Sequence, residues 1–203
     1  MLKFIYFDLG GVVIRDFDGT NNWDLLKKEL GIITAKNDKF EKLWKRYDAE
    51  INTTRDVNTL IPILNKELDL DIPQEYSLLD GFVSRFTKNK QIWPIIKNAR
   101  KKYKIGLLTN MYPGMLKTIG DRGILLQDKF DVIVDSSIEK VKKPDSNIYK
   151  LSELKCGFKS DEIMFIDNSE RNLIEPKKMG WQIFWYDNRN IEKSTKDLKN
   201  ILL

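Results

Sequence analysis

The chain has 203 residues and a net charge of +5. Its length and its apolar content of 41% allow one core, or a core with a smaller attached domain. One cysteine excludes an internal disulfide, and the lack of histidine excludes catalytic triads and zinc sites that need it. Asp8 interrupts the N-terminal apolar run that a signal peptide would need, and no apolar segment is long enough to span a membrane. We therefore expect a cytoplasmic protein without membrane partners. Its interleaved charges also argue against nucleic-acid binding.

A buried strand is predicted at the start of the chain, within Phe4–Ile14. Aromatic and β-branched residues lead to Asp8, and Gly10 and Gly11 follow closely. Such a continuous apolar run is typical of strands in parallel sheets. Asp8 would then lie at the carboxyl end of the strand, where open α/β sheets bind ligands. A glycine pair there lets the backbone turn tightly near a ligand. The same residues could also form an ordinary turn after a strand, and this stretch alone does not decide.

Four helical patterns follow a polar linker at residues 15–20. Large apolar residues recur at helical spacing, and no strand pattern interrupts residues 20–87. The four sets are Trp23, Leu26 and Leu30; Phe40, Leu43, Trp44 and Tyr47; Leu60, Ile61, Leu64 and Leu68; Leu78, Leu79, Phe82, Val83 and Phe86. We interpret residues 18–87 as an all-helical cap domain inserted into an α/β core formed by residues 1–17 and 88–203.

Strands alternate with helices in the rest of the chain. Buried strands are predicted at Lys104–Thr109, Phe130–Val134, Glu162–Asp167 and Trp181–Tyr186. Asp145 or Ser146 is expected to cap a helix that ends at Gly157, and Thr195 to cap the last helix. This alternation predicts an α/β fold with a doubly wound, Rossmann-like parallel sheet of five strands.

Polar residues follow three of these strands. Asp8, Thr109 with Asn110, and Asp167 come at strand ends, and Lys143 stands just before a helix start. In a parallel sheet these ends share one edge. Two carboxylates suit Mg²⁺, and a lysine with a hydroxyl group can bind phosphate oxygens.

Four short motifs resemble those of the haloacid dehalogenase superfamily, and they occur in the family's order. They are Asp8-Leu9-Gly10-Gly11-Val12, Leu108-Thr109-Asn110, Lys142-Lys143-Pro144-Asp145 and Phe165-Ile166-Asp167-Asn168-Ser169. The helical stretch lies where the family places a cap, so the resemblance covers the whole chain. It implies a hydrolase, more specifically a Mg²⁺-dependent phosphatase similar to bacterial glucose-1-phosphate phosphatases. The expected partner is a small phosphorylated metabolite such as a sugar phosphate.

The resemblance also assigns roles to individual residues. Asp8 is the expected nucleophile, which forms an aspartyl phosphate. Asp8, Asp167 and the main-chain carbonyl of Gly10 are the expected Mg²⁺ ligands. Thr109, the backbone of Asn110 and Lys143 are expected to bind the substrate phosphate. Neither the substrate nor the oligomeric state is indicated by the sequence.

Two positions depart from the family pattern. Gly10 stands where the phosphatases usually carry an acid/base aspartate, and Asn168 where a second carboxylate is common. Asp16, Asp18 or Glu170 could serve instead through water. Without such a substitute, we expect a preference for substrates with good leaving groups. Two alternatives remain open: a metal-independent dehalogenase-like hydrolase, and a non-catalytic protein that binds a phosphorylated ligand on the same fold.

Overall fold

The centre of the computed structural model, which describes residues 1–125 and 130–202, is a sheet of five parallel strands. They are β1 (Phe4–Phe7), β4 (Lys104–Thr109), β5 (Val132–Asp135), β6 (Ile163–Asp167) and β7 (Gln182–Trp185), in the spatial order β5-β4-β1-β6-β7. All four neighbouring pairs are parallel, with Phe4 opposite Lys104 on one side and Ile163 on the other. This confirms the predicted doubly wound α/β fold.

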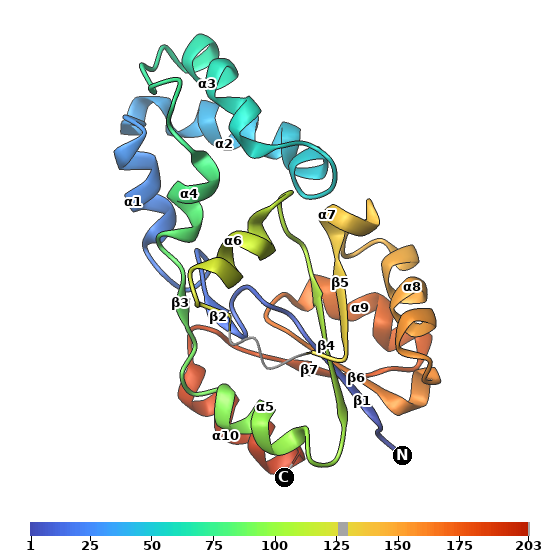
Figure 1. Ribbon diagram of the computed structural model, residues 1–203. Coiled ribbons are helices and arrows are strands. Elements are labelled where there is room, and N and C mark those ends of the chain that lie inside the picture. Colours follow the sequence, from blue (N-terminus) through green and yellow to red (C-terminus); the bar gives the residue numbers. More distant parts are fainter. Residues whose placement is uncertain (126–129, 203) are drawn as a thin grey trace.

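Alternate residues of β1 face opposite sides of the sheet, as the pleat requires. Ile5 and Phe7 belong to one apolar cluster, whereas Phe4 and Tyr6 belong to another. The first cluster includes residues of α5 (Trp93–Ala99), α6 (Met115–Asp121) and α10 (Ile191–Leu202). The second includes residues of α8 (Ser146–Cys156) and α9 (Glu170–Met179). Helices therefore cover both faces of the sheet (Figure 1).

Four helices lie between β2 and β3 in the chain and gather beyond one edge of the sheet (Figure 1). They are α1 (Asn22–Glu29), α2 (Thr34–Ile51), α3 (Ile61–Leu68) and α4 (Leu78–Val83), with a short 3₁₀ helix, η1 (Val57–Leu60), before α3. Each coincides with one of the four predicted apolar patterns, although Leu30, Leu60 and Phe86 lie just outside α1, α3 and α4. Pro62 is tolerated in the first turn of α3 because no intrahelical hydrogen bond is lost there.

A two-stranded antiparallel ribbon at the base of these helices was not predicted. β2 (Ile14–Arg15) pairs with β3 (Thr87–Lys88), so Arg15 does not belong to a linker and a strand begins at residue 87. Two-residue strands that are far apart in the sequence give no periodic signal. The expected domain boundary between residues 87 and 88 falls within this ribbon, and the division itself stays a prediction.

The predicted helix caps agree with the structure at α8 but not at the last helix. The Asp145 side chain caps α8, and Gly157 ends it in the left-handed conformation. The prediction for Thr195 was wrong, since α10 begins at Ile191 and the Asn190 side chain accepts from the Lys193 amide. The Thr195 hydroxyl instead pairs with Tyr186. Two short helices, α7 (Ser136–Glu139) and η2 (Ser160–Glu162), were not predicted.

Candidate active site

Three neighbouring strands bring the predicted polar residues to one edge of the sheet. Asp8 directly follows β1, while Thr109 and Asp167 are the last residues of β4 and β6. Because β4, β1 and β6 are adjacent and parallel, these ends lie side by side. Thr109 and Asp167 are fully buried, and Asp8 is nearly so. The sequence prediction of a shared edge is therefore correct.

The Lys143 ammonium group joins the two carboxylates. Its Nζ lies 3.0 Å from Asp8 Oδ1 and 2.6 Å from Asp167 Oδ2, and its side chain is fully buried. A buried charge is costly unless it is paired and hydrogen-bonded, so the two anions and the cation depend on one another. The ring centroid of Phe165 lies 5.1 Å from the same nitrogen and supplies a further weak attraction.

Burial and mutual charge shift the protonation of this cluster. Burial raises the pKa of Asp8 to about 7; Asp167 adds to the rise and Lys143 opposes it. Burial alone would lower the pKa of Lys143, but the two carboxylates together raise it above its ordinary value. The two carboxylates thus favour the cationic form of Lys143, whereas burial favours the protonated form of Asp8.

Residues of the second motif position the lysine and leave one donor free. The side-chain amide of Asn110 accepts from the Lys143 backbone N–H at 2.9 Å through Oδ1 and donates to the Lys143 carbonyl at 3.0 Å through Nδ2. These two hydrogen bonds fix the loop that carries Lys143. The Thr109 hydroxyl is buried and has no hydrogen-bond partner among the described residues. An unpaired buried hydroxyl is unfavourable, so a ligand oxygen would satisfy it.

Asn172 is a site residue that the sequence reasoning missed. Its Nδ2 donates to both oxygens of Asp167, at 3.2 and 3.1 Å, and the Ser169 amide donates to Oδ1 at 2.7 Å. Asn172 lies in the first turns of α9, the helix that follows β6. A polar residue so soon after the fourth motif was the signal that could have revealed it.

A side chain is excluded at Gly10 and at Gly11 for different structural reasons. Gly11 has a φ of +73°, and a Cβ there would lie 2.6 Å from Asn168 Nδ2. A side chain is therefore excluded by both conformation and space. At Gly10 the backbone is ordinary, but a Cβ would lie 2.3 Å from Asp16 Oδ2. The tight turn expected after Asp8 is thus present, and it brings a third carboxylate next to the loop.

The three carboxylates proposed as substitutes at Gly10 differ in their surroundings. Asp16 is partly buried; burial raises its pKa to about 7, opposed by the Asp18 amide and increased by the Asp18 charge. The carboxylate of Asp18 accepts from Asn168 Nδ2 at 2.7 Å. Glu170 is exposed and lines an open pocket with Asp18 and Trp185. Only Asp16 contacts the space beside Gly10.

The inserted helices close over this edge through several contacts. Lys142 forms an ion pair with Asp48 of α2. The Ser136 hydroxyl donates to the carbonyl of Asn52 at 2.6 Å. Tyr112, which follows β4, has a pKa raised by burial and by the charges of Asp48 and Asp16. These contacts join the inserted helices to the segments that follow the strand ends.

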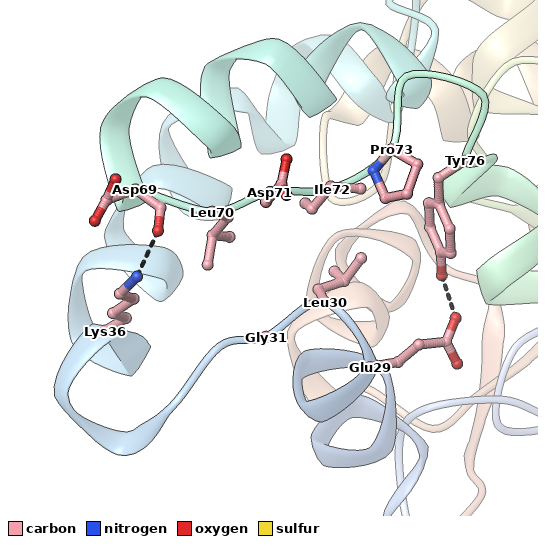
Figure 2. A pocket seen from close by; sticks show the side chains of 10 residues that line it. All are labelled: Glu29, Leu30, Gly31, Lys36, Asp69, Leu70, Asp71, Ile72, Pro73 and Tyr76. Atoms are coloured by element: carbon pink, nitrogen blue, oxygen red, sulfur yellow. Dashed lines mark hydrogen bonds between the residues drawn. The ribbon is translucent and has the colours of Figure 1, made fainter.

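A separate hollow of about 330 Å³ lies among the inserted helices, between α1 and the segment after α3 (Figure 2). Ten residues line it, among them Glu29, Lys36 and Tyr76, and none of the predicted site residues is included. Cys156 is half-buried at the end of α8, and burial raises the pKa of its thiol, which disfavours the reactive thiolate.

Comparison with known proteins agrees with the four motifs. A model of the haloacid dehalogenase-like hydrolases matches residues 2–180. The chain belongs to this hydrolase family. No curated protein matches the sequence. Within the described residues, no helix combines the length and apolar character needed to cross a membrane.

Solved structures show that this hydrolase shares the fold of the family. A HAD family enzyme, bt-2542 from Bacteroides thetaiotaomicron, solved with magnesium and inorganic phosphate, is 20% identical with a TM-score of 0.71; the match covers 93% of this chain and 96% of that one. A predicted HAD-like hydrolase from Porphyromonas gingivalis is 22% identical, with 98% of both chains covered and a TM-score of 0.71. The L-2-haloacid dehalogenase of Xanthobacter autotrophicus is 19% identical, with 90% and 76% covered and a TM-score of 0.64.

Proposed function

We propose that this hydrolase is a Mg²⁺-dependent phosphatase that acts on a small phosphorylated metabolite. The observation that carries the proposal is the buried group at the sheet edge: two carboxylates bridged by Lys143, beside a buried hydroxyl without a partner. A phosphate group would give the Thr109 hydroxyl and the lysine the oxygen acceptors that they need. The magnesium and phosphate bound to bt-2542, a protein of the same fold, are consistent with this chemistry.

The donor set fits Mg²⁺. Asp8 and Asp167 offer hard carboxylate oxygens, the kind of ligand this ion prefers, and the Gly10 carbonyl would add a third. Among the described residues, no group of three or more acidic, cysteine or histidine side chains could enclose a metal. An ion held by two carboxylates, one carbonyl and water is therefore the arrangement that the chain can offer. When bound, Mg²⁺ would reduce the repulsion between Asp8 and an anionic substrate.

The chain's own residues would perform two successive displacements. Asp8 attacks phosphorus and expels the alcohol, which leaves an aspartyl phosphate; water then attacks phosphorus and releases phosphate. Thr109, Lys143 and the Asn110 backbone would hold the phosphate oxygens in both steps. Asn172 would keep the Asp167 carboxylate in place, and Asn110 would do the same for the loop that carries Lys143.

The same geometry favours this function over dehalogenation. Attack on carbon needs no metal, whereas Asp8 and Asp167, the latter held by Lys143, Asn172 and Ser169, offer two hard carboxylates that suit Mg²⁺. The test is release of phosphate from a panel of phosphorylated metabolites, with Mg²⁺ and with a chelator, alongside halide release from 2-chloropropionate. Mg²⁺-dependent phosphate release supports the proposal. Halide release without metal, or no turnover of any compound, would refute it.

A further inference from the structure

The carboxylate of Asp16 occupies the space that a side chain at residue 10 would need. An ideal Cβ built on Gly10 lies 2.3 Å from Asp16 Oδ2 and 3.3 Å from its Cγ. Real Cβ atoms do not approach other atoms so closely. The backbone at Gly10 would accept a side chain, because its φ lies outside the left-handed region. Space alone therefore explains the glycine, and Asp16 fills that space.

The chain holds Asp16 there with a compact set of main-chain bonds. The Leu9 carbonyl accepts from the amides of Val13 and Ile14, each at 2.9 Å, which folds the segment back on itself. The Asp16 carbonyl accepts from Thr20 Oγ1 at 2.7 Å and from Asn22 Nδ2 at 2.8 Å. The main chain at Asp16 is thus held by the loop after Asp8 and by the start of α1, and the Asp16 carboxylate itself accepts from the Asp18 amide at 3.3 Å.

The proposed reaction needs a group that gives and takes a proton. An alkoxide leaves slowly unless its oxygen is protonated, and the attacking water must later lose a proton. Asp8 is occupied as the nucleophile and Asp167 is bound by Lys143 and Asn172. Of the other candidates, Asp18 is bonded to Asn168, and Glu170 is exposed on α9. Asp16 is the remaining carboxylate against the nucleophile loop.

We propose that Asp16 is the acid/base residue of this hydrolase and replaces the side chain that Gly10 lacks. This inference rests on the proposed phosphatase function. In the first step the bond between Asp8 and phosphorus forms, the bond to the leaving oxygen breaks, and the Asp16 proton moves to that oxygen. In the second step water bonds to phosphorus, its proton moves to Asp16, and the bond between Asp8 and phosphorus breaks. Both aspartates return to their starting forms.

One consequence differs from what Gly10 alone suggested. With a carboxyl group available to protonate the leaving oxygen, simple alkyl phosphates become substrates as well as aryl phosphates. The test compares the unmodified protein with Asp16→Asn on glucose 6-phosphate and 4-nitrophenyl phosphate, with Mg²⁺. Asp24→Asn, which makes the same chemical change at an exposed carboxylate of α1, is the matched control.

Asp16→Asn should lower kcat for the alkyl phosphate about 10²–10⁴-fold, the usual contribution of proton transfer. With the aryl phosphate, 4-nitrophenolate should appear in an initial burst whose amplitude is close to the enzyme concentration. Its release should then be slow, because the phospho-enzyme lacks the base that hydrolysis needs. Asp24→Asn should stay within about threefold of the unmodified rates, as expected for an exposed group away from proton transfer. Normal alkyl phosphate turnover in Asp16→Asn, or an equal loss on both substrates without a burst, would overturn the role of Asp16.

A transfer of the carboxylate gives a second, independent readout. Gly10→Asp alone should lower the melting temperature, because its Cβ collides with Asp16. Combining it with Asp16→Ala should restore the melting temperature and recover alkyl phosphate turnover relative to Asp16→Ala. A double variant no better than Asp16→Ala contradicts the proposal. Failure of the phosphatase function itself would look different: the unmodified protein would release no phosphate, or Asp8→Asn would still release it.

Discussion

At the scale of single residues, the cationic side chain of Lys143 stabilises the two buried carboxylates of the site. Two carboxylates lie at adjacent strand ends in a fully or nearly fully buried setting, where like charges repel strongly. The lysine between them offsets this repulsion, and its backbone is clamped by Asn110. The same ammonium group would face the substrate phosphate, so a residue needed for stability would also be needed for binding.

Lys143→Met should therefore destabilise the protein by about 3–5 kcal/mol, the usual cost of leaving buried charges without their partner. Urea unfolding followed by circular dichroism measures this. Lys142→Met is the matched control, because Lys142 pairs with Asp48 at a partly exposed position and such pairs contribute about 1 kcal/mol or less. Equal losses in the two variants would show that the Lys143 bridge is not an important part of the fold.

The nucleophile assignment makes a second residue-scale prediction. Asp8→Asn keeps the shape of the side chain but removes its charge and its ability to form an acyl phosphate. Phosphate release should fall by about 10⁴-fold or more, as when other enzymes lose their nucleophile. Asp161→Asn, an exposed carboxylate just before β6 at the opposite edge of the sheet, should change the rate little. Near-normal turnover in Asp8→Asn would refute the assignment.

At the scale of elements, the sequence predicted best where burial leaves no choice. β4 begins and ends at the predicted residues because its apolar run is fully buried after Lys104 and ends at the polar site. The ends of three strands then placed Asp8, Thr109 and Asp167 together without any knowledge of contacts. The ribbon of β2 and β3 could not be foreseen, since its pairing joins residues about seventy positions apart in sequence. The approach of Asp16 to Gly10 depends on the turn after Asp8, in which the Leu9 carbonyl accepts from the amides of Val13 and Ile14.

The cap helices depend on polar contacts that periodicity does not reveal, and Glu29 is the clearest case. Its Oε1 accepts from the Tyr76 hydroxyl at 2.6 Å, drawn in Figure 2, and Arg85 binds its other oxygen. Both contacts lower the pKa of Glu29, the tyrosine bond most. The contact joins the end of α1 to the segment before α4, which are far apart in sequence.

A lowered pKa in the folded state stabilises the protein above the unfolded value of 4.5, and this stabilisation is lost as the pH falls through the folded value. Glu29→Gln should therefore lower stability at pH 7 by about 1 kcal/mol or less, since the side chain is half exposed. The difference between the two proteins should shrink at pH 3. Melting temperatures of both proteins at the two pH values measure this, and a difference that grows on acidification would contradict it.

At the scale of the whole molecule, the fold places the candidate site between the strand ends and the inserted helices (Figure 1). The Phe82 and Trp44 rings of the inserted helices lie 5.2 and 6.5 Å from the ring of Tyr112, measured between centroids. Lys140 Nζ reaches the carbonyl of Thr53 at 3.1 Å. The substrate's leaving group would meet this aromatic wall, whereas its phosphate would meet the charged sheet edge. On the proposed function, the inserted helices would contribute to binding and the sheet edge to the chemistry.

Magnesium should stabilise the whole molecule through the sheet edge. An ion that binds only the folded chain raises stability by mass action, by about 2.7 kcal/mol at a hundredfold excess over Kd. For a chain of this length that corresponds to a rise in melting temperature of about 5–10 °C. Asp167→Ala should remove most of the rise, because one of two carboxylate ligands is gone. Asp161→Ala, which removes a surface carboxylate, should keep it. The comparison is a thermal melt of each protein with Mg²⁺ and with a chelator. A full Mg²⁺ response in Asp167→Ala would place the ion elsewhere in the molecule.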